Sequence, residues 1–415
     1  MSSSVASRSV FPSAFVALLA GTAIALLGGC AGMQKTSTRP PPRPAAQVAI
    51  TQPPSVPAPA VVVATPAPVR TGKPKIALLL PLSGRAREIG VALQEAAELA
   101  LFDGAGKDIV LVPLDTGDTP EGAVRAVERA ADEGVGLLLG PLFGPSAAAA
   151  AAVAKRAGIE MLTFSNDQGV AQPGLYVLGL AVEPQVARVV EFAARRGVRR
   201  YHAMLPPTPY GGQAMAALRA AAARNGATIG REERIPASGD TAVVAQRLTD
   251  AIKGDPAGAA LFVPIGPPRL SAVGQSLVDL EFDSRRARIV GTGVWDGPGA
   301  AAEKALAGAW FAAPDPARRA AFERKFAAVH DKPPPRLATL AYDAVMLSAQ
   351  LARVKPGGDF TPEALTTGEG FNGVDGLYMP LADGRVERAL AVLEVGPDGV
   401  KVVDPAPTSL RRPAN

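Results

Sequence analysis

Few side chains in this 415-residue sequence could carry out catalysis. The chain has two histidines, His202 and His330, and one cysteine, Cys30. His202 stands in an apolar run and His330 in a polar stretch, and neither has a cysteine or a second histidine at the spacing of metal ligands. A role in the core or at the surface is therefore the better interpretation for both, and the sequence predicts no metal site.

A glycine-rich run from 291 to 297 superficially resembles a dinucleotide-binding loop. Its third glycine comes one place late, and Pro298 and Gly299 interrupt the helix that such a loop needs. We interpret the run as a turn. Asp115 and Asp118 likewise fit a turn better than a pair of catalytic carboxylates. The sequence thus favours a protein that is not an enzyme and has no cofactor.

Cys30 is the one residue with a clear chemical context. It follows an uncharged apolar run, 11–27, that is preceded by Arg8, which is typical of a secretory signal. Leu27 and two glycines before the cysteine resemble the lipobox of bacterial lipoproteins. We therefore expect residues 1–29 to be a signal peptide and Cys30 to carry lipid, although an ordinary signal peptide with a coincidental cysteine is the alternative. In lipoproteins, Ala31 rather than aspartate implies the periplasmic face of the outer membrane.

The segment 30–72 is predicted to be a tether behind the lipidated cysteine. It is rich in proline, alanine and valine and lacks amphipathic periodicity, so extended polyproline geometry is expected. The segment 1–72 contains five basic residues and no acidic ones, so the rest of the chain has 38 residues of each charge. Nucleic acid is therefore not an expected partner.

The elements that must position a site alternate along the rest of the chain. Apolar runs such as 75–80, 109–114 and 136–139 predict buried parallel strands, and the segments between them have helical periodicity. The same alternation repeats from 183 to 291, and two successive helices, 315–330 and 337–354, follow. We expect two lobes, the first from 73–182 with 314–356 and the second from 183–313 with 370–404, before a tail at 405–415.

Ligands of open parallel sheets bind beyond the carboxyl ends of the strands, so residues at those ends are the candidate cleft residues. Hydroxyl groups and helix N-termini there could hold a carboxylate, and an acidic side chain could pair with an ammonium group. The alternative is that these residues cap helices around an empty groove. The candidates are Ser83, Phe143, Ser146, Thr163, Ser165, Asn166, Asp167, Tyr210, Trp295 and Asp296.

Several segments together resemble a known family. The first lobe looks like the type I periplasmic binding fold of branched-chain amino acid receptors. Within that superfamily, IALLLPLSG, LLLGPLFG, LGLAVEPQVARVVEFAARRG and GVDGLYMPLADGRVERALAVLEV resemble more closely the lipoprotein activators of penicillin-binding proteins. The resemblance implies an α/β fold of two Rossmann-like lobes joined by crossovers. For amino acid receptors it also implies, by position, a ligand role for Ser165 and, more loosely, for Asp296.

The resemblance and the lipoprotein features lead to one main expectation about function. We expect an outer-membrane lipoprotein that regulates peptidoglycan synthesis by binding and activating a class A penicillin-binding protein. The alternative is a solute-binding protein that delivers a branched-chain or related amino acid to an ABC transporter. Hydrolysis of the cell wall is disfavoured because no nucleophile or metal cluster is evident.

Overall fold

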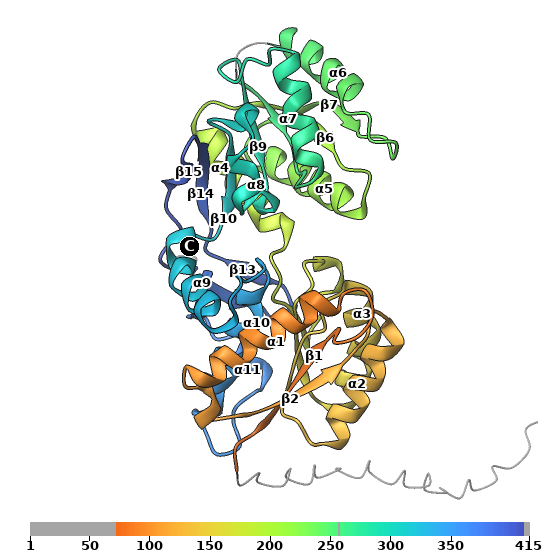
Figure 1. Cartoon of the computed structure of the whole chain (residues 1–415), viewed down its shortest axis with the longest axis vertical. Coiled ribbons are helices and arrows are strands. Elements are labelled where there is room, and N and C mark those ends of the chain that lie inside the picture. Colours follow the sequence, from red (N-terminus) through yellow and green to blue (C-terminus); the bar gives the residue numbers. More distant parts are fainter. Residues whose placement is uncertain (1–71, 256–257, 411–415) are drawn as a thin grey trace, which may run out of the picture. The chain divides into compact units, whose positions relative to one another are not determined.

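The computed structural model describes residues 72–255 and 258–410. The predicted signal peptide, Cys30 and all of the predicted tether except Gly72 lie outside the described residues. The described residues all fall within one compact unit, which contains two mainly parallel sheets and a small antiparallel sheet. Figure 1 shows the helices that flank the sheets.

The first lobe is built on a five-stranded parallel sheet in the order β2-β1-β3-β4-β5. Its strand β1 is buried on both faces, since Ile76 and Leu78 pack against α1 and α10 while Ala77 and Leu79 pack against α2 and α3. This is why the sequence shows a continuous apolar run instead of alternation. The strands are β1 Lys75–Leu80, β2 Val110–Asp115, β3 Leu137–Leu139, β4 Glu160–Thr163 and β5 Leu175–Val177.

Helices cover both faces of this sheet. Thr119 caps α2 by accepting a hydrogen bond from the backbone N–H of Gly122 at 3.1 Å, and Gly158 ends α3 in the left-handed conformation. The helical segments of the lobe are α1 Arg87–Phe102, η1 Ala105–Lys107, α2 Pro120–Asp132, α3 Gly144–Ala157, η2 Gln168–Val170, α9 Pro316–His330, α10 Ala338–Ala352 and α11 Pro362–Leu365.

The second lobe has a seven-stranded sheet in the order β15-β14-β10-β9-β8-β6-β7. Its strands from β10 to β7 are parallel, whereas β14 and β15 run antiparallel to their neighbours. The strands are β6 Arg200–Leu205, β7 Thr228–Arg234, β8 Ala259–Phe262, β9 Ala287–Gly291, β10 Trp310–Ala313, β14 Ala391–Gly396 and β15 Gly399–Asp404. The helical segments are α4 Val182–Arg195, α5 Pro209–Arg224, α6 Ala242–Lys253, α7 Arg269–Asp279, η3 Gly293–Trp295, α8 Pro298–Ala301 and η4 Lys304–Leu306.

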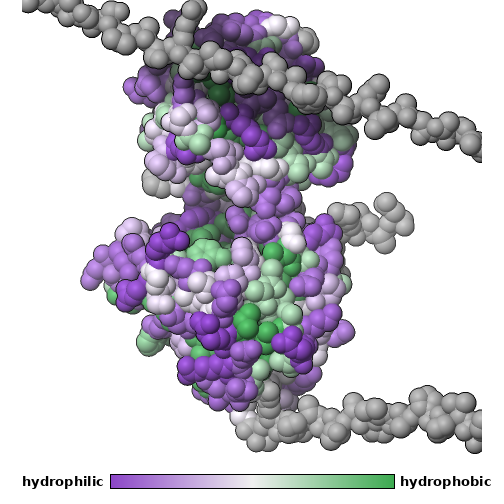
Figure 2. Space-filling model, turned by 90° about the vertical axis from the view of Figure 1, so that its right-hand side faces the viewer, coloured by the Kyte–Doolittle hydropathy of each residue, from purple (hydrophilic) through white to green (hydrophobic). Residues whose placement is uncertain are grey.

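The chain passes between the lobes at three places: after β5, after β10 and after β13. The predicted fold class, an α/β fold of two lobes with parallel sheets and crossovers, is confirmed. On the face drawn in Figure 2, hydrophilic side chains cover most of the surface and hydrophobic ones form small patches.

One predicted lobe boundary differs from the structure. Residues 370–404 were expected in the second lobe, but the small sheet of β11 Phe371–Gly373, β12 Gly376–Pro380 and β13 Val386–Arg388 packs on the first. Phe371, Tyr378 and Val386 are buried in the core that α1 and α10 share, so only the segment from about 389 joins the second lobe. The sequence could not show this, because a short hairpin can pack on either lobe.

Two local expectations are also corrected. Ser146 is not the N-cap of its helix: α3 begins at Gly144 after Phe143, and Ser146 lies buried in the first turn. Pro298 does not prevent a helix but starts the single-turn α8 at its first position, where the missing N–H of proline has no helical partner to lose.

Candidate functional site

A cavity of about 880 Å³ lies where the carboxyl ends of the two parallel sheets meet. Most of its lining comes from five loops that each follow a strand of one lobe or the other, and α1, the segment around the start of α4 and the segment before α10 add the rest. These loops contribute residues after β3 (142–143), after β4 (164 and 166), after β6 (206, 208 and 210), after β8 (264–269) and after β9 (293, 294 and 296). The parallel arrangement explains this convergence, because all carboxyl ends of a parallel sheet lie at one edge.

The walls of this cleft are mainly apolar. Leu142, Phe143 and Phe164 come from the first lobe, and Ile265 and Val294 come from the second. Short proline-containing segments before α5 and α7 complete the second wall. A cavity of this size with apolar walls and few polar groups is typical of small-molecule sites, which usually measure about 300–1,000 Å³.

Four of the predicted site residues line the cleft: Phe143, Asn166, Tyr210 and Asp296. Asn166 is exposed at the end of β4. The hydroxyl group of Tyr210 shares a hydrogen bond of 2.7 Å with that of Thr292, and burial raises the pKa of Tyr210 to about 12. Tyr210 is therefore a neutral residue of the wall over the physiological pH range.

Three predicted hydroxyl residues do not line the cleft. Thr163 is fully buried and donates a hydrogen bond of 2.6 Å to the carbonyl of Pro141. The Ser165 oxygen accepts a hydrogen bond from the backbone N–H of Asp167 at 3.1 Å. Ser146 is also buried. Thr163 thus satisfies a carbonyl of the loop after β3, and Ser165 satisfies a backbone N–H of the loop after β4.

The remaining three predicted residues have other surroundings. The backbone N–H of Ser83 donates at 3.2 Å to the carboxylate of Asp115, the last residue of β2. Asp167 accepts a hydrogen bond of 2.8 Å from Gln213, which connects the two lobes outside the cavity. Trp295 is 1% exposed, and its indole N–H donates to the carbonyl of Ile265 at 2.8 Å, so it supports the loop after β8 from behind.

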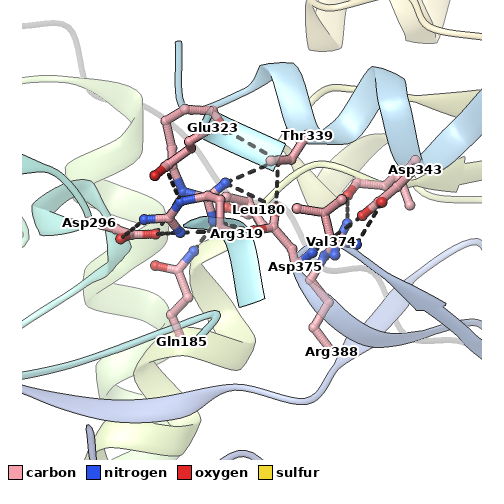
Figure 3. A network of polar contacts seen from close by, with 12 residues as sticks. Leu180, Gln185, Asp296, Arg319, Glu323, Thr339, Asp343, Val374, Asp375 and Arg388 are labelled. Carbon is pink, nitrogen blue, oxygen red and sulfur yellow. Dashed lines mark hydrogen bonds and ion pairs between the residues drawn. The ribbon is translucent and has the colours of Figure 1, made fainter. Parts of the chain in front are cut away.

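Asp296 is held by two arginines of the other lobe (Figure 3). Both guanidinium Nη atoms of Arg319, on α9, donate to its carboxylate at 2.8 and 2.9 Å, and Nε of Arg336, before α10, donates at 2.7 Å. The Asp296 side chain is only 3% exposed. The prediction that Asp296 pairs with a ligand ammonium group stays a prediction, but its carboxylate already has three donors.

Arg336 connects this pair to a second buried carboxylate. Its Nη atoms donate to both oxygens of Asp375 at 3.0 Å, and the Thr339 hydroxyl group donates to the same carboxylate at 2.6 Å. Burial by itself raises the pKa of Asp375, but the charge and hydrogen bonds of Arg336 outweigh it, and the pKa is lowered. Asp375 is therefore ionised and fixes Arg336 at the floor of the cleft.

No pattern in the sequence singled out Arg319, Arg336 or Asp375 as site residues. They stand 23, 40 and 79 positions after Asp296 and come from three different elements. Asp375 falls within the GVDGLY segment, which was noted only for its family resemblance. That segment was the one available signal for this residue.

Two negative observations apply to the described residues. They contain no group of three or more His, Cys, Asp or Glu side chains that could hold a metal ion. None of the helices among residues 72–255 and 258–410 is long and apolar enough to span a membrane.

Solved structures share this architecture over most of the chain. The structure resembles a branched-chain amino acid ABC transporter periplasmic ligand-binding protein from Burkholderia xenovorans LB400, with a TM-score of 0.68, 17% identity, and coverage of 80% of this chain and 94% of that one. It also resembles a solute-binding protein of an ABC transporter from Rhodopseudomonas palustris BisB5, solved in complex with 3,4-dihydroxybenzoic acid. That match has a TM-score of 0.62 and 18% identity, and it covers 80% of this chain and 96% of the other.

Sequence comparisons agree with the fold. An uncharacterized protein of Rickettsia prowazekii (strain Madrid E) is 25% identical over 136 residues, which are 33% of this chain and 36% of that protein. The family model described as "Periplasmic binding protein" matches residues 73–400, which include both lobes and the cleft between their sheets. This chain therefore belongs to the periplasmic binding protein family.

Proposed function

We propose that this protein binds a small solute with an apolar body in the cleft and delivers it to an ABC transporter. The observation that carries the proposal is the cavity of about 880 Å³ at the carboxyl ends of both sheets. Family membership supports it, and so do the relatives of the same fold that are named as solute-binding proteins. This places the solute-binding alternative ahead of the main expectation from the sequence.

The apolar character of the walls supports a solute with an aliphatic or aromatic body. Burying apolar surface is worth about 25 cal/mol per Å², so a solute of 150–200 Å² would gain roughly 4–5 kcal/mol before its binding costs. Structures of similar fold from Rhodopseudomonas palustris are named as complexes with benzoate and 4-hydroxybenzoate. Benzoates and branched aliphatic acids are therefore the first solutes to test.

The test is a thermal-shift and calorimetry panel on the full chain. A solute present at 100 times its Kd is expected to add about 2.7 kcal/mol to the free energy of unfolding. Val294 lines the cleft and is 40% exposed, so its side chain has room to be replaced. Val294→Trp should fill the cleft and abolish the response. Val329→Trp is the matched control, because this residue is 56% exposed and lies outside the cleft. If no solute of a broad panel binds, the proposal is wrong.

The second candidate function is regulation of a class A penicillin-binding protein from the outer membrane. It is supported by the sequence segments that resemble the lipoprotein activators and by the lipobox-like residues before Cys30. The test immobilises the full chain, passes detergent-solubilised synthases over it, and measures glycan polymerisation and crosslinking with and without it. Saturable binding with a faster synthase would support this function. If the chain neither binds a synthase nor changes its rate, the result would count against this function.

A further inference from the structure

Three charged side chains line the cleft among the described residues: Asp296, Arg336 and Arg269. The charge of a solute that enters must be matched by whichever of these groups is free to contact it. Their present partners therefore decide which solute charges the cleft can accept.

Asp296, the one acidic group of the lining, is not free. It accepts three hydrogen bonds from the guanidinium groups of Arg319 and Arg336, all between 2.7 and 2.9 Å. Three of the roughly four acceptor positions of its carboxylate are filled, and two guanidinium cations already balance its charge. To bond an ammonium group through more than the one remaining position, it would have to leave cations whose own side chains are only 8% and 20% exposed. Breaking a buried ion pair on one side leaves an uncompensated buried charge, which is strongly unfavourable.

Arg336 is also committed. Its Nε is bonded to Asp296 and both of its Nη atoms are bonded to Asp375, whose side chain is completely buried. A solute anion would have to compete with two carboxylates that are already in place. Arg336 is therefore part of the floor of the cleft and is not its solute anchor.

Arg269 differs from both. It is exposed, it is the first residue of α7, and it forms no ion pair or side-chain hydrogen bond with any described residue. The polar lining near the strand ends otherwise includes neutral groups, such as the amide of Asn166 and the hydroxyl group of Thr208. The helices α3, α5 and α7 also begin at the cleft without a side-chain cap, so the positive ends of their dipoles add to the charge of Arg269.

From this arrangement we infer that the cleft takes small monoanionic solutes with an apolar body, that Arg269 holds the anion, and that the cleft rejects the same solute when it carries an ammonium group. The inference rests on the proposed solute-binding function. The physical reason is that a carboxylate meets a free cation and helix N-termini, whereas an ammonium group must lose its water against apolar walls with no free carboxylate.

A series of solutes with one carbon skeleton isolates each charge. The solutes 4-methylpentanoate, leucine and 4-methylpentanamide share a branched aliphatic body, and only leucine carries an ammonium group while only the amide lacks the carboxylate. With calorimetry on the full chain, we expect the acid to bind at least about tenfold more tightly than either of the others, the factor that 1.4 kcal/mol gives. Benzoate against benzamide repeats the comparison on an aromatic body.

Variants of the anchor test its role. Arg269→Gln should reduce the preference for acid over amide about tenfold or more, because one charge-assisted hydrogen bond is lost, and Arg269→Lys should retain part of it. Arg156→Gln is the matched control. This residue is also exposed and without a partner among the described residues, but it lies at the end of α3 that is remote from the cleft.

The outcomes separate this inference from the function on which it rests. Leucine binding as tightly as 4-methylpentanoate would overturn the inference and leave solute binding intact. An unchanged preference for acid over amide in Arg269→Gln would overturn the role of Arg269. If neither acids, amides nor amino acids bind, both the inference and the proposed function are wrong.

Discussion

Asp296 lines the cleft, as predicted, but its present partners are side chains of the other lobe. Its position after β9 brings it to the cleft, as expected for a residue at the carboxyl end of a parallel strand. Its carboxylate, however, joins the second lobe to Arg319 and Arg336 of the first. The residue therefore holds the lobes together, and its effect on stability should be large.

Asp296→Asn is expected to lower the free energy of unfolding by about 3–5 kcal/mol, since it leaves two mostly buried guanidinium groups without their charged partner. Urea unfolding followed by circular dichroism measures this. Asp250→Asn is the control, because that side chain is 58% exposed and its replacement should change stability by no more than about 0.5 kcal/mol. Equal stability of the two variants would contradict the buried ion cluster.

Asp343 provides a second, pH-dependent test. It is buried on α10 near Asp375, Arg388 and Tyr378, and desolvation by burial raises its pKa from 3.8 to about 7, although the backbone N–H of Val374 donates to it. Between pH 3.8 and about pH 7, Asp343 is therefore protonated in the folded state and ionised in the unfolded state. Stability from this group is full below about pH 4, falls as the pH rises to about 7, and is constant above that.

Asp343→Asn should remove the loss of stability that the wild type shows between pH 4 and 7, because asparagine does not titrate. The wild type is expected to lose stability relative to the variant by at most about 1.4 kcal/mol per pH unit between pH 4 and 7, which is the slope for one proton. Denaturant unfolding at pH steps from 4 to 8 measures the difference. Parallel profiles for the two proteins would show that Asp343 does not titrate in this range.

At the scale of elements, the loop after β8 depends on the packing of η3 behind it. The ring of Trp295 supports Ile265 and lies against Gly291, where an added Cβ would come within 2.5 Å of three ring carbons. Only glycine leaves room for this buried ring. The shape of the cleft wall therefore depends on a glycine that does not itself line the cleft.

Gly291→Ala is expected to displace Trp295, lower the free energy of unfolding by about 1–3 kcal/mol, and weaken solute binding, because overpacking a filled core forces side chains to move. Tryptophan fluorescence reports the displacement of the ring, denaturant unfolding the loss of stability, and calorimetry the weaker binding. Gly297→Ala is the matched control, since its Cβ meets nothing within 4 Å and its φ of 174° is extended backbone. A variant at 291 that behaves like the control would show that the ring can move freely.

At the scale of the whole molecule, the lobes are connected by the chain and by side chains. The chain passes between them three times, and polar contacts add further links, including Asp296 with Arg319 and Asp167 with Gln213. The contact between Asp167 and Gln213 lies outside the cavity. Opening of the cleft must therefore break side-chain contacts as well as bend the connecting segments.

The place of the protein in the cell depends on residues outside the described structure. If Cys30 carries lipid, Cys30→Ala should release the chain from the membrane into the soluble periplasmic fraction, because the lipid chains supply the apolar surface that enters the bilayer. Fractionation followed by immunoblotting measures this. Membrane retention equal to that of the wild type would contradict lipidation.

Much of the fold could be predicted because its strands and helices differ strongly in pattern. The run 75–80 is the strand β1, the run 136–139 contains β3, and the helix predicted at 315–330 begins one residue later in the structure. The strands β5 and β10 were missed, because neither stands between two helices of several turns as the equally short β3 does, so no helical pattern on both sides marks them. The candidate site was only partly predicted. Four of its ten residues line the cleft, and Arg269 and Arg336 were not selected.

The sequence by itself determined that two α/β lobes form and that their cleft residues follow the strands. Both conclusions come from local patterns: buried parallel strands are apolar throughout, and their ends face one edge. Only the tertiary structure decided which side chains are free. Asp296, Arg336 and Asp375 are far apart in the chain, and their pairing leaves Arg269 as the cleft's free charge among the described residues. No local pattern records such a pairing, because it depends on how the lobes pack together.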